Sequence, residues 1–162
     1  MNIIKYFINL IRNDTPKNPN EFVKKFIKDS KKERAQLELI YDDEIILQVD
    51  ALNFVPSWFK ITNKSAKDFK NGYVIFFSKN TEDFYGSHAE RELNHLEKDD
   101  FIKIEETYDN LPVTTVAKFV SAIDNYLSLA NEMKDFVNKF YRFKERDPSI
   151  LFNIRYLPNL EG

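Results

Sequence analysis

The sequence predicts an α+β fold: a mainly antiparallel sheet of about five or six strands, with two N-terminal helices and one long C-terminal helix packed on it. Two kinds of apolar spacing carry this prediction. In several short runs, apolar residues alternate with polar ones, as in a strand with one exposed face. Near both ends of the chain they recur every three or four positions, as in an amphipathic helix. The length of 162 residues fits a single globular domain, residues 1–162.

Two helices are predicted near the N-terminus. The first spans residues 2–12, and its apolar residues fall on one face: Ile3, Ile4, Phe7, Ile8 and Ile11. After a linker at residues 14–17, Asn18 is the expected N-cap of the second helix, and Pro19 lies in its first turn. Glu21 is expected to complete a capping box. The expected buried face of this helix consists of Phe22, Val23, Phe26 and Ile27.

A β-hairpin is predicted to follow. Residues 37–41 and 45–49 alternate apolar with polar side chains, and Asp42 and Asp43 separate the two runs. This pattern favours two antiparallel strands around a two-residue turn, with one face exposed to solvent. Residues 58–62 are a third expected strand.

Three further strands complete the predicted sheet. The turn signal Asn71-Gly72 precedes residues 73–78, a continuous apolar run typical of a central strand. Residues 101–107 and 150–157 again alternate apolar with polar side chains, so we expect a strand at each.

The longest predicted helix spans residues 112–144. Its first apolar stripe consists of Val113, Val116, Val120, Ile123, Leu127, Ala130, Val137 and Phe140. A second stripe beside it consists of Phe119, Tyr126, Leu129, Met133, Phe136 and Phe143. One stripe is enough to dock a helix on a sheet. Either this helix lies between the sheet and the N-terminal helices, or its second stripe closes a homodimer.

Composition excludes several kinds of chemistry. The chain has no cysteine, which excludes a disulfide scaffold, a thiolate metal site and a cysteine nucleophile. Its three glycines are too few for a phosphate-cradling loop or a dinucleotide fingerprint. The apolar residues 1–11 are interrupted by Lys5 and Asn9 and are too few for a membrane span. We therefore expect a cytoplasmic protein with no membrane segment and no cofactor.

Residues 80–110 carry a concentration of acidic charge. Ten carboxylates stand against three basic residues, so this segment is net −7, while the whole chain is −2 and the remainder is therefore +5. Such negative potential steers a basic protein and raises its association rate. Phe84 and Tyr85 would supply aromatic contacts beside the charges. The predicted partner-binding residues are Glu82, Asp83, Phe84, Tyr85, Glu90, Glu92, Glu97, Asp99 and Asp100.

Both histidines lie in the same segment. Ser87 and Glu90 have the spacing of a capping box, so we expect a short helix to begin there. His88, Glu92 and His95 then share one face of the helix, and these residue types can bind Zn²⁺. However, the two histidines are two turns apart, about 10 Å along the helix axis, which is too far for both to bind one ion. We therefore predict no metal site.

Nucleic-acid binding and hydrolysis are less favoured. Residues 24–34 include six basic residues, but the chain is slightly acidic overall and has no aromatic–basic stacking motif. Glu105 and Glu106 are adjacent on a predicted strand, so they point to opposite faces and cannot flank one bond. No catalytic residue is predicted.

The leading functional hypothesis is a small protein-binding module. Most concretely, we expect an inhibitor or immunity-type protein whose acidic surface neutralises a basic partner, such as a toxin nuclease with a positively charged substrate groove. One alternative is a metal-dependent hydrolase that uses the His/Glu cluster. Another is a homodimeric structural protein joined through the second stripe of the long helix.

Overall fold

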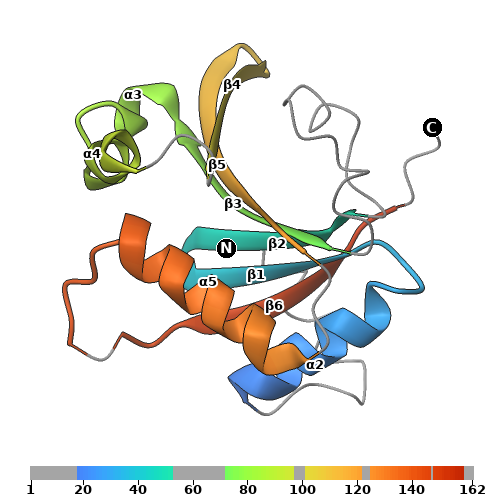
Figure 1. The fold of residues 1–162 in the computed structure, drawn as a ribbon. Coiled ribbons are helices and arrows are strands. Elements are labelled where there is room, and N and C mark those ends of the chain that lie inside the picture. Colours follow the sequence, from blue (N-terminus) through green and yellow to red (C-terminus); the bar gives the residue numbers. More distant parts are fainter. Residues whose placement is uncertain (1–17, 53–71, 97–100, 122–124, 147, 159–162) are drawn as a thin grey trace.

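The structure, a computed structural model, describes residues 18–52, 72–96, 101–121, 125–146 and 148–158. Within these ranges the chain forms a six-stranded antiparallel sheet and four helices (Figure 1), which confirms the predicted α+β fold class. Some predicted features lie outside the described residues: the helix at 2–12, the strand at 58–62 and the first residue of the Asn71-Gly72 turn.

The strands of the sheet are ordered β4-β5-β3-β2-β1-β6, and each neighbouring pair is antiparallel. They are β1 (Ala35–Tyr41), β2 (Glu44–Ala51), β3 (Tyr73–Asn80), β4 (Ile102–Tyr108), β5 (Leu111–Val120) and β6 (Leu151–Tyr156). Strand β3 lies in the interior of the sheet, as predicted for its continuous apolar run. The two edge strands are β4 and β6.

The helices of the described chain are α2 (Pro19–Asp29), α3 (Thr81–Phe84), α4 (His88–His95) and α5 (Tyr126–Phe140). Helix α2 begins as predicted, because the side chain of Asn18 accepts a hydrogen bond of 3.0 Å from the backbone N–H of Glu21. Helices α2 and α5 contact each other and pack on one face of the sheet (Figure 1). Helices α3 and α4 follow the end of β3 and lie near the other end of α5 (Figure 1).

One hydrophobic core fills the space between the helices and the sheet. It includes Phe26 of α2, Met133 of α5 and Ile75 of β3. A smaller cluster covers the opposite face of the sheet: Leu52, Val74, Phe76, Ala117 and Phe119. Because successive residues of β3 alternate between the two clusters, this strand is buried on both faces, and its sequence shows no alternation of polarity.

Two hairpins have left-handed two-residue turns. Asp42 and Asp43 join β1 to β2 with φ values of 51° and 62°, which confirms the predicted acidic turn. Asp109 and Asn110 join β4 to β5 with φ values of 48° and 66°. Positive φ at both central residues suits the right-handed twist of the flanking strands, and Asp and Asn tolerate it better than most residues.

The C-terminal helix is shorter than predicted, because residues 111–120 form β5 rather than the start of a helix. The run Val113 to Val116 consists of β-branched residues, which fit a pleated surface better than a helix. The helix begins only after Asn125, whose side chain accepts a hydrogen bond of 3.1 Å from the backbone N–H of Ser128.

The two apolar stripes expected on a single helix are therefore divided between β5 and α5. Leu129, Met133 and Phe136, all from the second stripe, are buried in the main core. The spacing argument for a homodimer, which needed this stripe to be exposed, no longer applies.

The β1–β2 hairpin was predicted to have one exposed face, and this detail is wrong. Glu38 is 3% exposed and Asp50 is 5% exposed. Asp50 accepts hydrogen bonds from Nε2 of Gln36 at 3.2 and 3.3 Å, and Gln36 Oε1 accepts one from Gln48 at 3.0 Å. On the other side, Asn153 of β6 donates a hydrogen bond of 2.9 Å to Glu38. A row of largely buried polar side chains thus crosses three strands and makes its hydrogen bonds mostly within the sheet. Among the described residues, Oε1 of Glu38 has no hydrogen-bond partner, and the guanidinium of Arg155 lies 3.8 Å from it.

Candidate partner-binding surface

The acidic segment begins with α3, a single turn that directly follows β3. Phe84 in this turn is 0% exposed and belongs to the main core. The prediction that Phe84 would contact a partner is therefore corrected: its ring anchors α3 to the domain. The neighbouring Tyr85 is 48% exposed and remains on the surface.

Helix α4 begins at the predicted cap. The Ser87 hydroxyl oxygen accepts a hydrogen bond of 3.3 Å from the backbone N–H of Glu90, and the hydroxyl donates one of 2.6 Å to the carbonyl of Phe84. The Glu90 carboxylate accepts a hydrogen bond from the N–H of Gly86, one residue before the position a capping box would use. Gly86 has a φ of 81°, a backbone conformation that residues with a side chain rarely adopt. Glu90 is therefore engaged in ordering the α3–α4 connection.

Tyr85 is held in place by β4. Its hydroxyl donates a hydrogen bond to the carboxylate of Glu105, and the ammonium of Lys103 lies 3.5 Å from the same carboxylate. The hydrogen bond from Tyr85 is the main cause that lowers the pKa of Glu105, followed by the charge of Lys103. Lys103 also lies 5.6 Å from the centre of the Tyr85 ring. Tyr85, Lys103 and Glu105 thus link the α3–α4 connection to the edge strand.

The two histidines do not converge on one point. His88 Nε2 lies 3.2 Å from the carbonyl oxygen of Lys139 in α5, and its Nδ1 lies 3.8 Å from the Glu92 carboxylate. His95 is exposed at the last position of α4. In the part of the chain that the structure describes, no group of three or more His, Cys, Asp or Glu residues is arranged to hold a metal ion.

The remaining carboxylates of the acidic segment are more available to a partner. Glu82 and Asp83 are exposed on α3, and neither forms an ion pair with any described residue. Glu92 is 38% exposed along its side chain and is paired only with His88 at 3.8 Å among the described residues. Three predicted partner-binding residues lie outside the described part of the chain: Glu97, Asp99 and Asp100.

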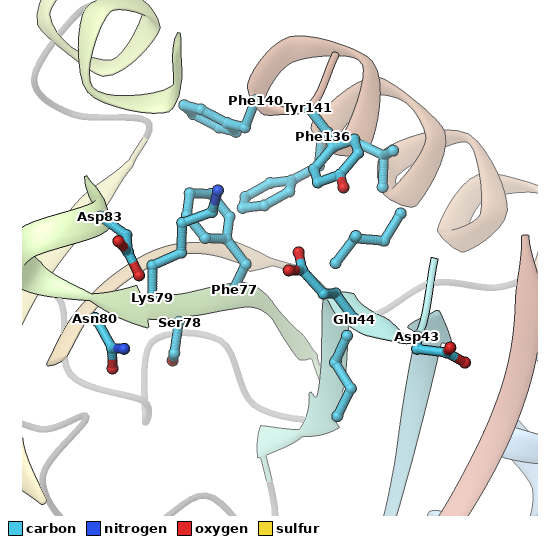
Figure 2. A pocket seen from close by; sticks show the side chains of 13 residues that line it. Asp43, Glu44, Phe77, Ser78, Lys79, Asn80, Asp83, Phe136, Phe140 and Tyr141 are labelled. Atoms are coloured by element: carbon cyan, nitrogen blue, oxygen red, sulfur yellow. The ribbon is translucent and has the colours of Figure 1, made fainter. Parts of the chain in front are cut away.

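A pocket of 730 Å³ opens beside this surface, between α5, the end of β3 and the β1–β2 turn (Figure 2). Phe77, Phe136 and Phe140 line its apolar side, and their ring centres lie 5.0 to 6.0 Å apart. Tyr141 lies at the rim of this aromatic group. Offset and edge contacts of this kind fix ring positions, so the apolar wall is rigid.

Charged residues flank the aromatic wall. Asp83 lies on one side of the pocket, Glu44 points toward Tyr141, and Asp43 lies at the far edge (Figure 2). Lys79 is the basic residue among those lining the pocket, so three carboxylates face one ammonium there. None of these four residues forms an ion pair with another described residue.

No local pattern in the sequence indicates this pocket as a unit. Its residues come from the β1–β2 turn, from the start of β2, from the end of β3, from α3 and from the end of α5. Only Asp83 was among the predicted partner-binding residues. Asp42 and Asp43 are predicted as a turn, which they form, and Asp43 also lines the pocket together with Glu44 from the start of β2.

Comparisons with known proteins add nothing to the geometry of the site. No protein-family model matches the chain, and neither a curated protein nor a solved structure matches it significantly. Among the described helices, none is both long enough and apolar enough to cross a membrane.

Proposed function

We propose that this protein is a protein-binding module that captures a basic partner through the acidic surface of α3 and α4. In its most concrete form it is an inhibitor of the immunity type, which neutralises a toxin nuclease. The single observation that carries the proposal is the state of α3. Phe84 fixes this turn in the core, while the adjacent Glu82 and Asp83 are exposed and have no ion-pair partner among the described residues.

Charge and rigidity together suit such a surface to fast capture. The net charge of −7 over residues 80–110 produces a local negative potential on a chain that is otherwise positive. A potential of this kind raises the encounter rate with a basic protein, and salt screens it over about 10 Å at 0.1 M. Tyr85, tied to Glu105, adds an aromatic contact that loses little side-chain entropy on binding.

A nuclease fits this proposal because it presents a groove lined with lysine and arginine to the phosphate backbone. An acidic protein that covers such a groove competes directly with the substrate. This choice of partner follows from charge complementarity, and it makes salt sensitivity a required property of the complex.

The test is capture of a partner by the immobilised full chain from a lysate of the organism that encodes it. The captured protein is identified by mass spectrometry, and its capture is measured between about 50 and 500 mM salt. The wild-type chain is compared with a double variant, Glu82→Lys with Glu92→Lys. A matched variant, Glu33→Lys with Asp135→Lys, makes the same change in net charge at exposed residues outside α3 and α4.

We expect a basic partner that is lost from the Glu82/Glu92 variant and from the wild-type chain at high salt, but retained by the Glu33/Asp135 variant. Circular dichroism of both variants checks that the fold is intact. Equal capture by both double variants, or a captured partner of acidic isoelectric point, would overturn the proposal.

A further inference from the structure

The pocket beside the acidic surface has a feature that general electrostatic attraction does not require. It combines the aromatic wall of Phe77, Phe136 and Phe140, which has Tyr141 at its rim, with carboxylates on both sides (Figure 2). A surface that only attracts positive charge needs no concave apolar site. The volume of 730 Å³ is large enough for one long side chain of a partner.

We propose that this pocket receives an arginine side chain of the basic partner, with the guanidinium against Tyr141 and between the carboxylates of Glu44 and Asp83. The inference rests on the proposed function, because it names the group through which the partner is anchored. A guanidinium fits better than an ammonium for two reasons. Its flat face stacks on an aromatic ring, and its fork of N–H donors matches a carboxylate.

Lys79 supplies direct support for a cation at this position. Its ammonium lies 5.9 Å from the centre of the Tyr141 ring, so a positive charge already occupies the approach to that ring. Lys79 nevertheless forms no ion pair with another described residue. The three carboxylates of the pocket therefore exceed its one internal cation, and the resulting negative potential favours a second cation there.

The Tyr141 ring is also held ready for stacking. It makes an edge contact with Tyr41, with ring centres 5.9 Å apart, and a tilted contact with Phe143 at 5.0 Å. Burial and then the negative charge of Glu44 raise the pKa of Tyr141, which places that carboxylate within electrostatic reach of the ring. An arginine bound here would meet the ring and the carboxylate together.

The experiment titrates the ¹⁵N-labelled full chain with N-acetyl-arginine amide and follows backbone amide shifts by NMR. N-acetyl-citrulline amide is the matched probe, since it has the same shape without the positive charge. We expect the arginine probe to shift the amides of Glu44, Phe77 and Tyr141, with a dissociation constant on the order of 1 mM. The citrulline probe should produce no comparable shifts.

Three variants should differ in the affinity of the pocket for the arginine probe. Glu44→Gln should weaken binding of the arginine probe about fivefold, the worth of one charge pair of about 1 kcal/mol in water. Lys79→Gln should strengthen binding by a similar factor, because it removes a like charge from the pocket. Asp135→Asn is the matched control: Asp135 is exposed beside Phe136 in α5 but does not line the pocket, so binding should not change.

Equal binding of the two probes, shifts that fall outside the pocket, or weaker binding by Lys79→Gln would overturn the inference. These results are distinct from those that test the proposed function. A partner captured through Glu82 and Glu92 but unaffected by Glu44→Gln would retain the acidic surface and reject the arginine pocket. If the arginine probe bound in the pocket but no basic partner were captured, the arginine pocket would stand and the proposed function would be rejected.

Discussion

The hydroxyl of Tyr85 donates a hydrogen bond to the carboxylate of Glu105, which joins the α3–α4 connection to the edge strand β4. The two residues are twenty positions apart in the chain, and Lys103 approaches the same carboxylate at 3.5 Å. The acidic surface is therefore attached to the sheet at two points, through the buried ring of Phe84 and through this exposed hydrogen bond.

Removal of the Tyr85 hydroxyl should change the titration of Glu105. The hydrogen bond from Tyr85 is the largest cause that lowers the pKa of Glu105, so Tyr85→Phe should raise that pKa toward its usual value. Carbon-detected NMR of the Glu105 carboxylate as a function of pH measures the change. Lys103→Met is a useful comparison, because Lys103 lowers the same pKa through its charge and a hydrogen bond, so its removal should also raise the pKa of Glu105. An unchanged pKa in Tyr85→Phe would show that the hydrogen bond is absent in solution.

Phe84 and Tyr85 should respond very differently to truncation. Phe84 is 0% exposed, so Phe84→Ala should lower the free energy of unfolding by about 3 to 5 kcal/mol. Tyr85→Ala should leave thermal unfolding almost unchanged. Urea denaturation of both variants distinguishes a core residue from a surface residue. Phe84→Leu, which keeps most of the apolar volume, should retain partner capture, and a loss of capture in that variant would return Phe84 to the binding surface.

Asp50 should make stability depend on pH. Burial raises its pKa from 3.8 to about 6, against the hydrogen bonds from Gln36 and the charges of Arg34 and Arg155, while the charge of Glu38 acts in the same direction as burial. Because the folded-state pKa is the higher one, the protonated form is favoured by folding. The stabilisation is complete below pH 3.8 and is lost as the pH rises through about 6.

Asp50→Asn removes this titration and keeps an oxygen that accepts from Gln36. The variant should therefore gain stability relative to the wild-type chain as the pH rises from 4 to 7, by up to about 3 kcal/mol. Urea denaturation at several pH values measures the difference. A difference for Asp50→Asn that stays constant across this pH range would contradict the buried titration.

The start of α5 can be tested through its cap. Asn125 accepts a hydrogen bond of 3.1 Å from the N–H of Ser128, so Asn125→Ala should destabilise the protein by about 1 kcal/mol. Asn125→Ser and Asn125→Asp should restore most of the loss, since both side chains also cap helices. If the helix instead began near Pro112, residue 125 would lie inside it, and alanine there would be neutral or stabilising.

The elements predicted correctly are those that one local pattern, such as a turn pair or a helix cap, is enough to define. The turn at Asp42 and Asp43 and the capped helix starts at Asn18 and Ser87 agree with the structure. The strand predicted at 73–78 corresponds to β3, which extends to Asn80. Each depends on neighbours within a few positions, where spacing and turn chemistry dominate.

The prediction for residues 112–144 was less successful because two periods fit the same residues. The apolar members of β5 are buried on both faces, so no alternation distinguished this strand from a helix. The left-handed pair Asp109 and Asn110 was the available signal for a hairpin, and it resembles the pair at 42 and 43.

The predicted exposure was also wrong where polar side chains hydrogen-bond to one another across strands. Gln36, Glu38 and Asp50 looked like an exposed face, yet they bond across strands and are buried. The pocket could not be predicted for a related reason. Glu44, Lys79 and Tyr141 are far apart in the sequence, and only the fold brings them together.

The pairing of β6 with β1 sets the order in which the protein can be completed during synthesis. Glu38 receives its hydrogen bond from Asn153, a partner 115 positions later in the chain. Until β6 leaves the ribosome, β1 is an open edge with a carboxylate that lacks this donor. At about 5 to 20 residues per second, that exposed edge persists for about 5 to 20 seconds after the β1–β2 hairpin has emerged. Throughout that time β1 is an unpaired edge that another chain can pair with, and only the last strand of the sheet covers it.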